Sequence, residues 1–166
     1  MSSPDGRDDF NFFFGRWTVQ HRRLRDRLAG SKTWDNFGGS SHAQALLGGL
    51  GNVDDNVIEL PPELGGPYRA ATLRAFDPQH HAWRIWWLDG RMPTEIGVPM
   101  LGRFEGEGGG RQGVFYADED FKGRPIRVRF LWLHTLTERP RWEQAFSTDG
   151  GRSWETNWEM DFTRLA

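Results

Sequence analysis

A single histidine stands in a stretch of the chain that is otherwise apolar. His134 continues the alternation of Phe130 and Trp132, so we expect its imidazole to point into an apolar interior. There it could ligate haem iron or act as a general acid or base. A buried histidine that only hydrogen-bonds a neighbouring group is the alternative interpretation.

A carboxylate and a guanidinium lie close together in a second stretch. Asp89 continues the inward alternation of Ile85 and Trp87, and Arg91 follows two residues later. The two charged groups are therefore expected to meet at the rim of the interior, where they could orient a ligand. An ion pair that only holds the loop before Pro93 is the alternative.

The composition predicts an interior lined by aromatic rings. The chain has nine Trp and twelve Phe among 166 residues, and alternation places a few hydrogen-bonding side chains beside them. Tyr116 joins His134, Asp89 and Arg91 as a candidate catalytic residue. The candidate ligand-binding residues are Trp87, Phe130, Trp132, His134, Trp142, Gln144, Phe146, Thr156 and Trp158. A filled aromatic core without a cavity is the alternative.

Several other kinds of site have no support in the sequence. The chain has no cysteine, which excludes disulfides, thiolate catalysis and thiolate metal ligands. It lacks a Gly-x-Gly-x-x-Gly phosphate loop, a Gly-x-Ser-x-Gly nucleophile turn and a histidine pair at zinc-ligand spacing, so no metal site is predicted. The acidic residues at 54–55 and 118–120 are interpreted as solvated charge at strand ends.

β-Strands must position these side chains, because alternation with a period of two recurs along the chain and no helical period is sustained. The expected strands lie at 16–27, 34–46, 53–60, 68–76, 82–89, 100–106, 112–118, 125–136, 141–148 and 154–163. Short turns between them favour an all-β fold of about ten antiparallel strands in an up-and-down barrel. The whole chain, 1–166, is expected to form one domain, with a flexible N-terminus at 1–7 and one capping helical turn at 8–14.

A turn motif is expected to join the last two strands. Its spacing is Ser147-x-Asp149-x-Gly151, with Trp154 following. The pattern resembles an Asp-box, in which the carboxylate accepts backbone N–H groups and the Trp packs beneath the glycine. A single copy in a short chain predicts a structural hairpin and no glycosidase activity.

The two ends of the chain carry a family resemblance. Gly15-x-Trp17 at the first strand, with Arg164 near the end of the last, resembles the signature of the calycin barrels, which include lipocalins, fatty-acid-binding proteins and nitrobindin-like barrels. Uncharacterised bacterial lipocalin-like domains are the most similar group. The resemblance implies that the arginine packs across the Trp and closes one end of the barrel, which places a functional opening at the other end. In nitrobindin-like barrels it also implies a haem-ligating histidine nearer the chain end than His134, and no histidine follows His134 here.

Charge and hydropathy bound the partners and the location. A net charge of −2 gives no field that would recruit nucleic acid or an anionic membrane. The N-terminus lacks the apolar core of a signal peptide, and no apolar run approaches the roughly 20 residues of a membrane helix, so a cytoplasmic location is expected. Outward alternation of Trp86, Leu88, Leu131 and Leu133 predicts a homodimer that covers these side chains.

Three functions are consistent with these patterns. The first is binding of a small hydrophobic or aromatic molecule inside the barrel. The second is a small barrel enzyme of isomerase, cyclase or decarboxylase type that uses His134 or Asp89. The third is haem binding through His134, although no cofactor is predicted from the sequence itself. The sequence leaves the identity of the ligand open, because strand register decides which rings line a cavity and which fill it.

Overall fold

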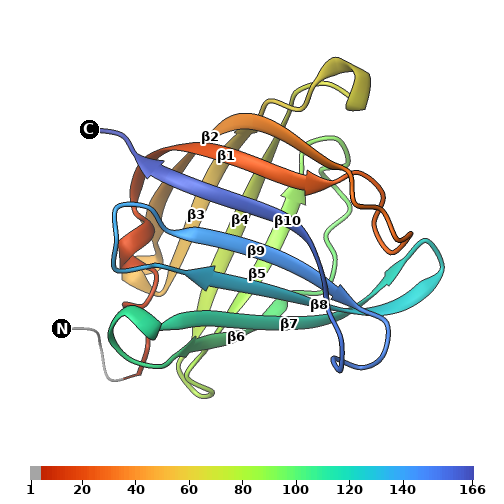
Figure 1. Cartoon of the computed structure of the whole chain (residues 1–166). Coiled ribbons are helices and arrows are strands. Elements are labelled where there is room, and N and C mark those ends of the chain that lie inside the picture. The colour runs from red at the N-terminus through yellow and green to blue at the C-terminus, as the bar shows by residue number, and fades with distance from the viewer. Residues whose placement is uncertain (1–4) are drawn as a thin grey trace.

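Ten antiparallel strands close into a barrel in the computed structural model, which describes residues 5–166 (Figure 1). Each strand pairs with its neighbours in the sequence, and the last pairs with the first. The strands are β1 (Gly15–Leu24), β2 (Trp34–Leu46), β3 (Gly51–Ile58), β4 (Tyr68–Asp77), β5 (Ala82–Asp89), β6 (Met100–Glu105), β7 (Gln112–Phe121), β8 (Arg124–Leu133), β9 (Arg141–Ser147) and β10 (Glu155–Arg164). Short 3₁₀ turns lie at η1 (Asn11–Phe13), η2 (Leu47–Gly49), η3 (Pro62–Leu64) and η4 (Gly108–Gly110). The predicted all-β up-and-down barrel is confirmed.

Alternating burial turns each strand into a wall of the barrel. Strand β4 buries every second residue from Tyr68 to Phe76, and the residues between them are exposed or half-buried. Because side chains alternate between the two faces of a strand, this pattern sets the register against β3 and β5. The buried rows of all ten strands therefore face one common interior.

The start of the chain plugs one end of this interior. Trp17 is fully buried, and its indole N–H donates to the Phe13 carbonyl at 2.8 Å. Strands β1 and β10 pair Trp17 with Arg164, whose guanidinium lies 4.1 Å from the indole ring centroid. The same guanidinium donates to the carbonyls of Phe12 and Phe14, each at 2.7 Å. The contact expected from the sequence is thus present, and it ties the first strand, the last strand and the plug together.

Gly15 allows the sharp change of direction between the plug and β1. Its φ is +118°, a conformation that residues with a side chain rarely adopt, and a Cβ there would lie 2.9 Å from the Arg164 guanidinium. A glycine is therefore needed both for the turn and for the close approach of the arginine.

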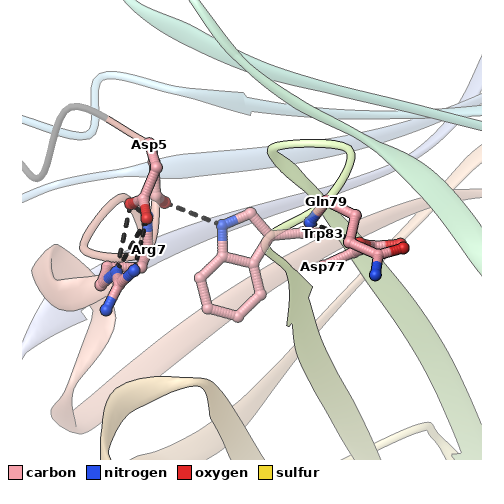
Figure 2. A network of polar contacts seen from close by, with 6 residues as sticks. Asp5, Arg7, Asp77, Gln79 and Trp83 are labelled. Atoms are coloured by element: carbon pink, nitrogen blue, oxygen red, sulfur yellow. Dashed lines mark hydrogen bonds and ion pairs between the residues drawn. The ribbon is translucent and has the colours of Figure 1, made fainter.

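Aromatic contacts hold the plug against the barrel wall. The Phe13 ring lies 4.8 Å from Trp132, and the Phe10 ring packs edge-on against Trp83 at 5.0 Å. The Trp83 indole N–H donates to the Gly6 carbonyl at 3.1 Å, beside the Asp5–Arg7 turn (Figure 2). Of the N-terminus that was expected to be flexible, residues 1–4 lie outside the described residues.

The hairpin between β9 and β10 has the geometry of the predicted turn motif. The Asp149 carboxylate accepts the backbone N–H groups of Arg152 and Ser153 at 3.0 and 2.9 Å, and the Ser147 hydroxyl accepts that of Gly151 at 2.8 Å. The Ser153 hydroxyl also donates to this carboxylate at 2.6 Å, and the hydrogen bonds from the Ser153 side chain and backbone, followed by that from the Ser147 hydroxyl, hold the pKa of Asp149 far below its usual range. The Trp154 ring lies against Gly151, as the motif requires.

The outer face of the barrel carries apolar side chains. Trp86 pairs with Leu73 and Leu88 with Ala71, so both lie outside, where Leu73 is 38% exposed. Leu131 and Leu133 are half-buried on the outer side of β8. The homodimer through this face stays a prediction. No helix among the described residues is long and apolar enough to cross a membrane.

Substitution Arg164→Gln tests the closure of the plugged end. The variant loses the guanidinium stacked on Trp17 and its hydrogen bonds to two carbonyls, so we expect the free energy of unfolding to fall by about 2 kcal/mol. Urea denaturation followed by Trp fluorescence measures the change. Arg139→Gln, in the exposed β8–β9 turn, is the control and should change stability by less than about 0.5 kcal/mol. Equal losses in the two variants would contradict this assignment.

Candidate functional site

A cavity of about 310 Å³ lies at the end of the barrel opposite the plug. Its walls combine aromatic rings with a charged rim, and the rim residues come from the ends of β1, β4, β5 and β7 and from the β1–β2 loop. The residues that line it are Arg23, Arg27, Tyr68, Trp87, Asp89, Arg91, Glu119, Phe121, Val128, Phe130, Trp142, Gln144, Phe146 and Trp158. Most of the ligand-binding residues predicted from the sequence therefore meet around one space.

The aromatic wall is held by contacts between the rings. Trp142 packs edge-on against Phe130 at 4.9 Å and against Trp158 at 5.6 Å. Trp87 meets Trp158 edge-on at 5.9 Å from the other side of the interior. Edge-to-face contacts of this kind fix the rings relative to one another, so the wall is a rigid apolar surface.

Trp132 and Gln144 both point into the barrel, but they line different cavities. Trp132 is 2% exposed, against the plug, and lines a small inner cavity of about 30 Å³ with Trp142 and Phe130. Gln144 lines the larger cavity and donates to the Asn157 side chain at 2.9 Å. Both predicted residues therefore face the interior.

The cavity has a side compartment between β5 and β7. Strand β6 pairs with β5 only from Trp83 to Ile85, so the mouth half of β5 has no strand neighbour on that side, where residues of the 90–99 loop line an opening. A space of about 260 Å³ lies there, and it shares Trp87, Asp89, Glu119 and Phe130 with the main cavity. The two spaces are therefore adjacent parts of one site.

Asp89 and Arg91 meet at the mouth, as the sequence predicts. The Arg91 guanidinium donates to both carboxylate oxygens of Asp89, at 2.9 and 2.7 Å, and lies 3.7 Å from the Tyr68 ring centroid. The hydrogen bonds from Arg91 lower the pKa of Asp89. Asp89 is therefore ionised at neutral pH, and Arg91 is hydrogen-bonded to both of its carboxylate oxygens.

The acidic residues at 118–120 are exposed, as expected from the sequence, and Glu119 also lines the cavity. Asp118 is exposed and pairs with Arg127 at 2.9 Å, but Glu119 faces the cavity from the next position on β7. Partial burial raises the pKa of Glu119. Alternation along β7 explains the difference between these neighbours, because the strand runs three residues further than predicted.

A buried polar cluster on β3 and β4 was missed in the sequence. Asp54, which was expected to be solvated, is 2% exposed and forms an ion pair of 2.6 Å with Arg74, itself 4% exposed. Arg74 also donates to Asn52 at 2.9 Å, and Asn56 donates to Asp54. Asn52, Asp54 and Asn56 alternate along β3, and this alternation could have indicated an inward polar row. The arginine that compensates the buried charge of Asp54 lies on the neighbouring strand β4, so the sequence of β3 alone does not reveal it.

This cluster forms the floor of the inner cavity. Asp54, Asn56, Thr72 and Arg74 line that space opposite the aromatic wall. The Arg74 guanidinium also stands 4.9 Å from the Phe10 ring centroid, so the plug covers its other side. The barrel interior is therefore polar on β3 and β4 and aromatic on β8 to β10.

His21 is the histidine that lies inside the barrel. It is 2% exposed, its ring stacks on Phe37 at 4.9 Å, and its Nδ1 accepts the Trp158 indole N–H at 3.1 Å. Burial, followed by the charge of Arg23, lowers the pKa of His21 to about 4. A ring that accepts at Nδ1 and stays neutral orients Trp158 in the cavity wall.

The prediction that His134 points into the interior is wrong. Strand β8 ends at Leu133, and His134 takes a φ of +55° in the exposed turn that follows. Its carbonyl accepts the Thr137 hydroxyl at 2.8 Å and the Thr137 N–H at 3.1 Å. The turn lies at the plugged end, so His134 is remote from the cavity and cannot serve it as an acid, a base or a haem ligand.

Two other predicted residues lie on the outer face. A β-bulge in β10 between Thr156 and Trp158 shifts the alternation, so Thr156 pairs with outward Ala145 and Asn157 takes the inward place. Tyr116 is 44% exposed, and its ring lies 6.0 Å from the Trp154 ring outside the barrel. Neither side chain can contact a ligand in the interior.

No protein-family model and no curated protein matches this chain. Across residues 5–166, no three histidine, aspartate or glutamate side chains gather where they could hold a metal ion. The function therefore has to be inferred from the cavity itself.

The depressed pKa of His21 predicts a pH-dependent stability. Between about pH 6.5 and 4 the unfolded chain binds the proton that the folded protein excludes, so stability is full above pH 6.5 and falls as the pH approaches 4. The difference between the pKa of His21 in the unfolded chain, 6.5, and in the folded protein, about 4, corresponds to about 3 kcal/mol in the free energy of unfolding. Urea denaturation at pH 7 and pH 4.5 should show about 2 kcal/mol of this loss in the wild type, because pH 4.5 is still above the folded-state pKa, and a smaller loss in His21→Phe. His81→Asn, in an exposed turn, should keep the wild-type dependence; a slope unchanged in His21→Phe would refute the assignment.

Proposed function

We propose that the protein binds a small hydrophobic or aromatic molecule inside its barrel. One observation carries the proposal: a cavity of about 310 Å³ opens at the end opposite the plug, between rings of β5, β8, β9 and β10. Small-molecule sites in proteins are typically concave, mostly apolar and about 300–1,000 Å³ in volume, with a few polar groups that orient the ligand. The volume and the lining support this function.

The resemblance to calycin barrels supports the same function. The closed barrel of ten antiparallel strands is compatible with a calycin-like fold, and the Trp17–Arg164 contact closes one end. What this likeness implies is a ligand held in the interior and admitted at the open end. We therefore place the binding site among Trp87, Phe130 and Trp142.

The catalytic and haem alternatives are not carried forward. The haem alternative depended on His134 and the catalytic one on His134 or Asp89, and His134 lies in the turn at the plugged end. Asp89, the other candidate acid or base, is held ionised by Arg91 at the mouth. These two groups are better suited to hold the rim than to exchange protons with a bound molecule.

Two adjacent tryptophans offer a matched test. Trp87 faces the cavity, and Trp86 lies on the outer face of the same strand. We expect the neutral fluorophore N-phenylnaphthylamine to bind with one-to-one stoichiometry, and Trp87→Ala to weaken it about tenfold because a large part of the apolar wall is lost. Trp86→Ala should leave the affinity within about twofold of the wild type.

Fluorescence titration gives the affinities, and isothermal titration calorimetry gives the stoichiometry. Near-ultraviolet circular dichroism checks that both variants keep the fold. Absence of saturable binding, or equal weakening in the two variants, would overturn the proposed function.

A further inference from the structure

We propose that the cavity selects ligands with an anionic group, such as an aromatic or hydrophobic acid whose carboxylate or sulfonate lies between Arg23 and Arg27 at the mouth. The inference rests on the proposed function, since it names the chemical class of the molecule that the barrel would hold. It is carried by two arginines of the cavity lining, Arg23 and Arg27, which form no ion pair with any carboxylate of residues 5–166.

Arg23 stands on the inner face of β1 at the mouth. Its guanidinium lies 5.5 Å from the ring centroids of both Phe37 and Trp158. In the part of the chain from residue 5 to 166, no carboxylate forms an ion pair with it. Contacts with ring faces leave the in-plane N–H groups of a guanidinium free to donate.

Arg27 approaches the same cavity from the β1–β2 loop. It lies 5.1 Å from the Phe121 ring centroid and 5.7 Å from that of Phe146. The loop is held over the mouth because the Leu28 N–H donates to the Glu155 carboxylate at 2.9 Å. Burial, followed by the nearby charge of Arg23, lowers the pKa of Arg27. Two guanidinium groups thus share a partly desolvated space.

Tyr68 adds a hydroxyl to this group. It lines the same cavity, and its buried oxygen lies close to the Arg23 side chain without forming a well-aligned hydrogen bond to any residue from 5 to 166. Burial raises the pKa of Tyr68, so the hydroxyl keeps its proton and can donate. Arg91 differs from the other two arginines because Asp89 already satisfies it. Arg23, Arg27 and Tyr68 are therefore the donors of the cavity that no carboxylate of residues 5–166 binds.

The acidic side chains near the cavity do not neutralise the arginines at the mouth, Arg23 and Arg27. Asp89 is occupied by Arg91, and Glu155 accepts from the β1–β2 loop. Glu119 lies where the main cavity meets the side compartment between β5 and β7, and it forms no ion pair with Arg23 or Arg27 among the described residues. The anionic group of a ligand is attracted to Arg23 and Arg27. The apolar remainder of the ligand would then lie against the aromatic wall. A charge-assisted bidentate contact of this kind is about twice as strong as a neutral hydrogen bond.

Two probes with the same ring system separate the charge from the apolar body. Anilinonaphthalene sulfonate carries a sulfonate that N-phenylnaphthylamine lacks. We expect the wild type to bind the sulfonate about tenfold more tightly than the neutral probe at low salt, and added salt to reduce only the affinity for the sulfonate. Displacement of one probe by the other, with one-to-one stoichiometry by calorimetry, shows that both occupy the barrel.

Arginine variants locate the anion. Arg27→Gln and Arg23→Gln should each weaken the sulfonate about tenfold and leave the neutral probe within about twofold. Arg25→Gln is the control, because it removes the same charge from the same loop at an exposed residue paired with Asp35. It should leave both affinities near those of the wild type.

The outcomes separate the inference from the proposed function. If the neutral probe binds but the sulfonate gives no advantage, or if Arg25→Gln weakens the sulfonate as much as Arg27→Gln and Arg23→Gln do, the anion site is refuted and the apolar cavity stands. If neither probe binds one-to-one, both proposals fall. Circular dichroism and binding of the neutral probe verify folding, and Arg23→Gln decides the question if Arg27→Gln does not fold.

Discussion

The closure of β1 on β10 is the constraint on which the rest of the structure depends. It pairs Trp17 with Arg164, and this arginine also binds the carbonyls of the turn that plugs the barrel. One set of contacts therefore joins the two ends of the chain, completes the sheet and fills one end of the interior. Since the plug occupies that end, any cavity large enough for a ligand must lie toward the other.

The walls of the barrel interior differ in polarity from one group of strands to the next. The wall from β8 to β10 is aromatic, whereas β3 and β4 contribute the buried Asp54–Arg74 pair. Loss of one partner from a buried pair leaves an uncompensated charge and costs about 3–5 kcal/mol, so the pair is a rigid part of the floor. At the mouth the charges are not balanced in this way, because no carboxylate of the described residues, 5–166, forms an ion pair with Arg23 or Arg27. The unpaired cations mark the part of the cavity where a ligand would contribute the missing charge.

The fold and the aromatic lining could be predicted from the sequence because alternation is strong in β4, β8 and β9. The prediction of inward residues failed where a local irregularity changed which face of the strand a side chain lies on. The left-handed conformation of His134 ended β8 at Leu133, and a bulge in β10 turned Thr156 outward. Asp54 could not be identified as buried, because its partner Arg74 belongs to another strand and only tertiary pairing brings them together. Periodicity specifies faces of regular strands, and it does not specify bulges or partners across strands.

The central claim is that the open half of the barrel is a binding cavity for an apolar molecule. Nuclear magnetic resonance of the tryptophan indole N–H groups tests it most directly, because each of the nine tryptophans gives a separate probe. On addition of N-phenylnaphthylamine, the account predicts that the signals of Trp87, Trp142 and Trp158 shift while that of the outer Trp86 stays in place. Shifts confined to Trp86 and other outer residues, or no saturable shift at all, would contradict it.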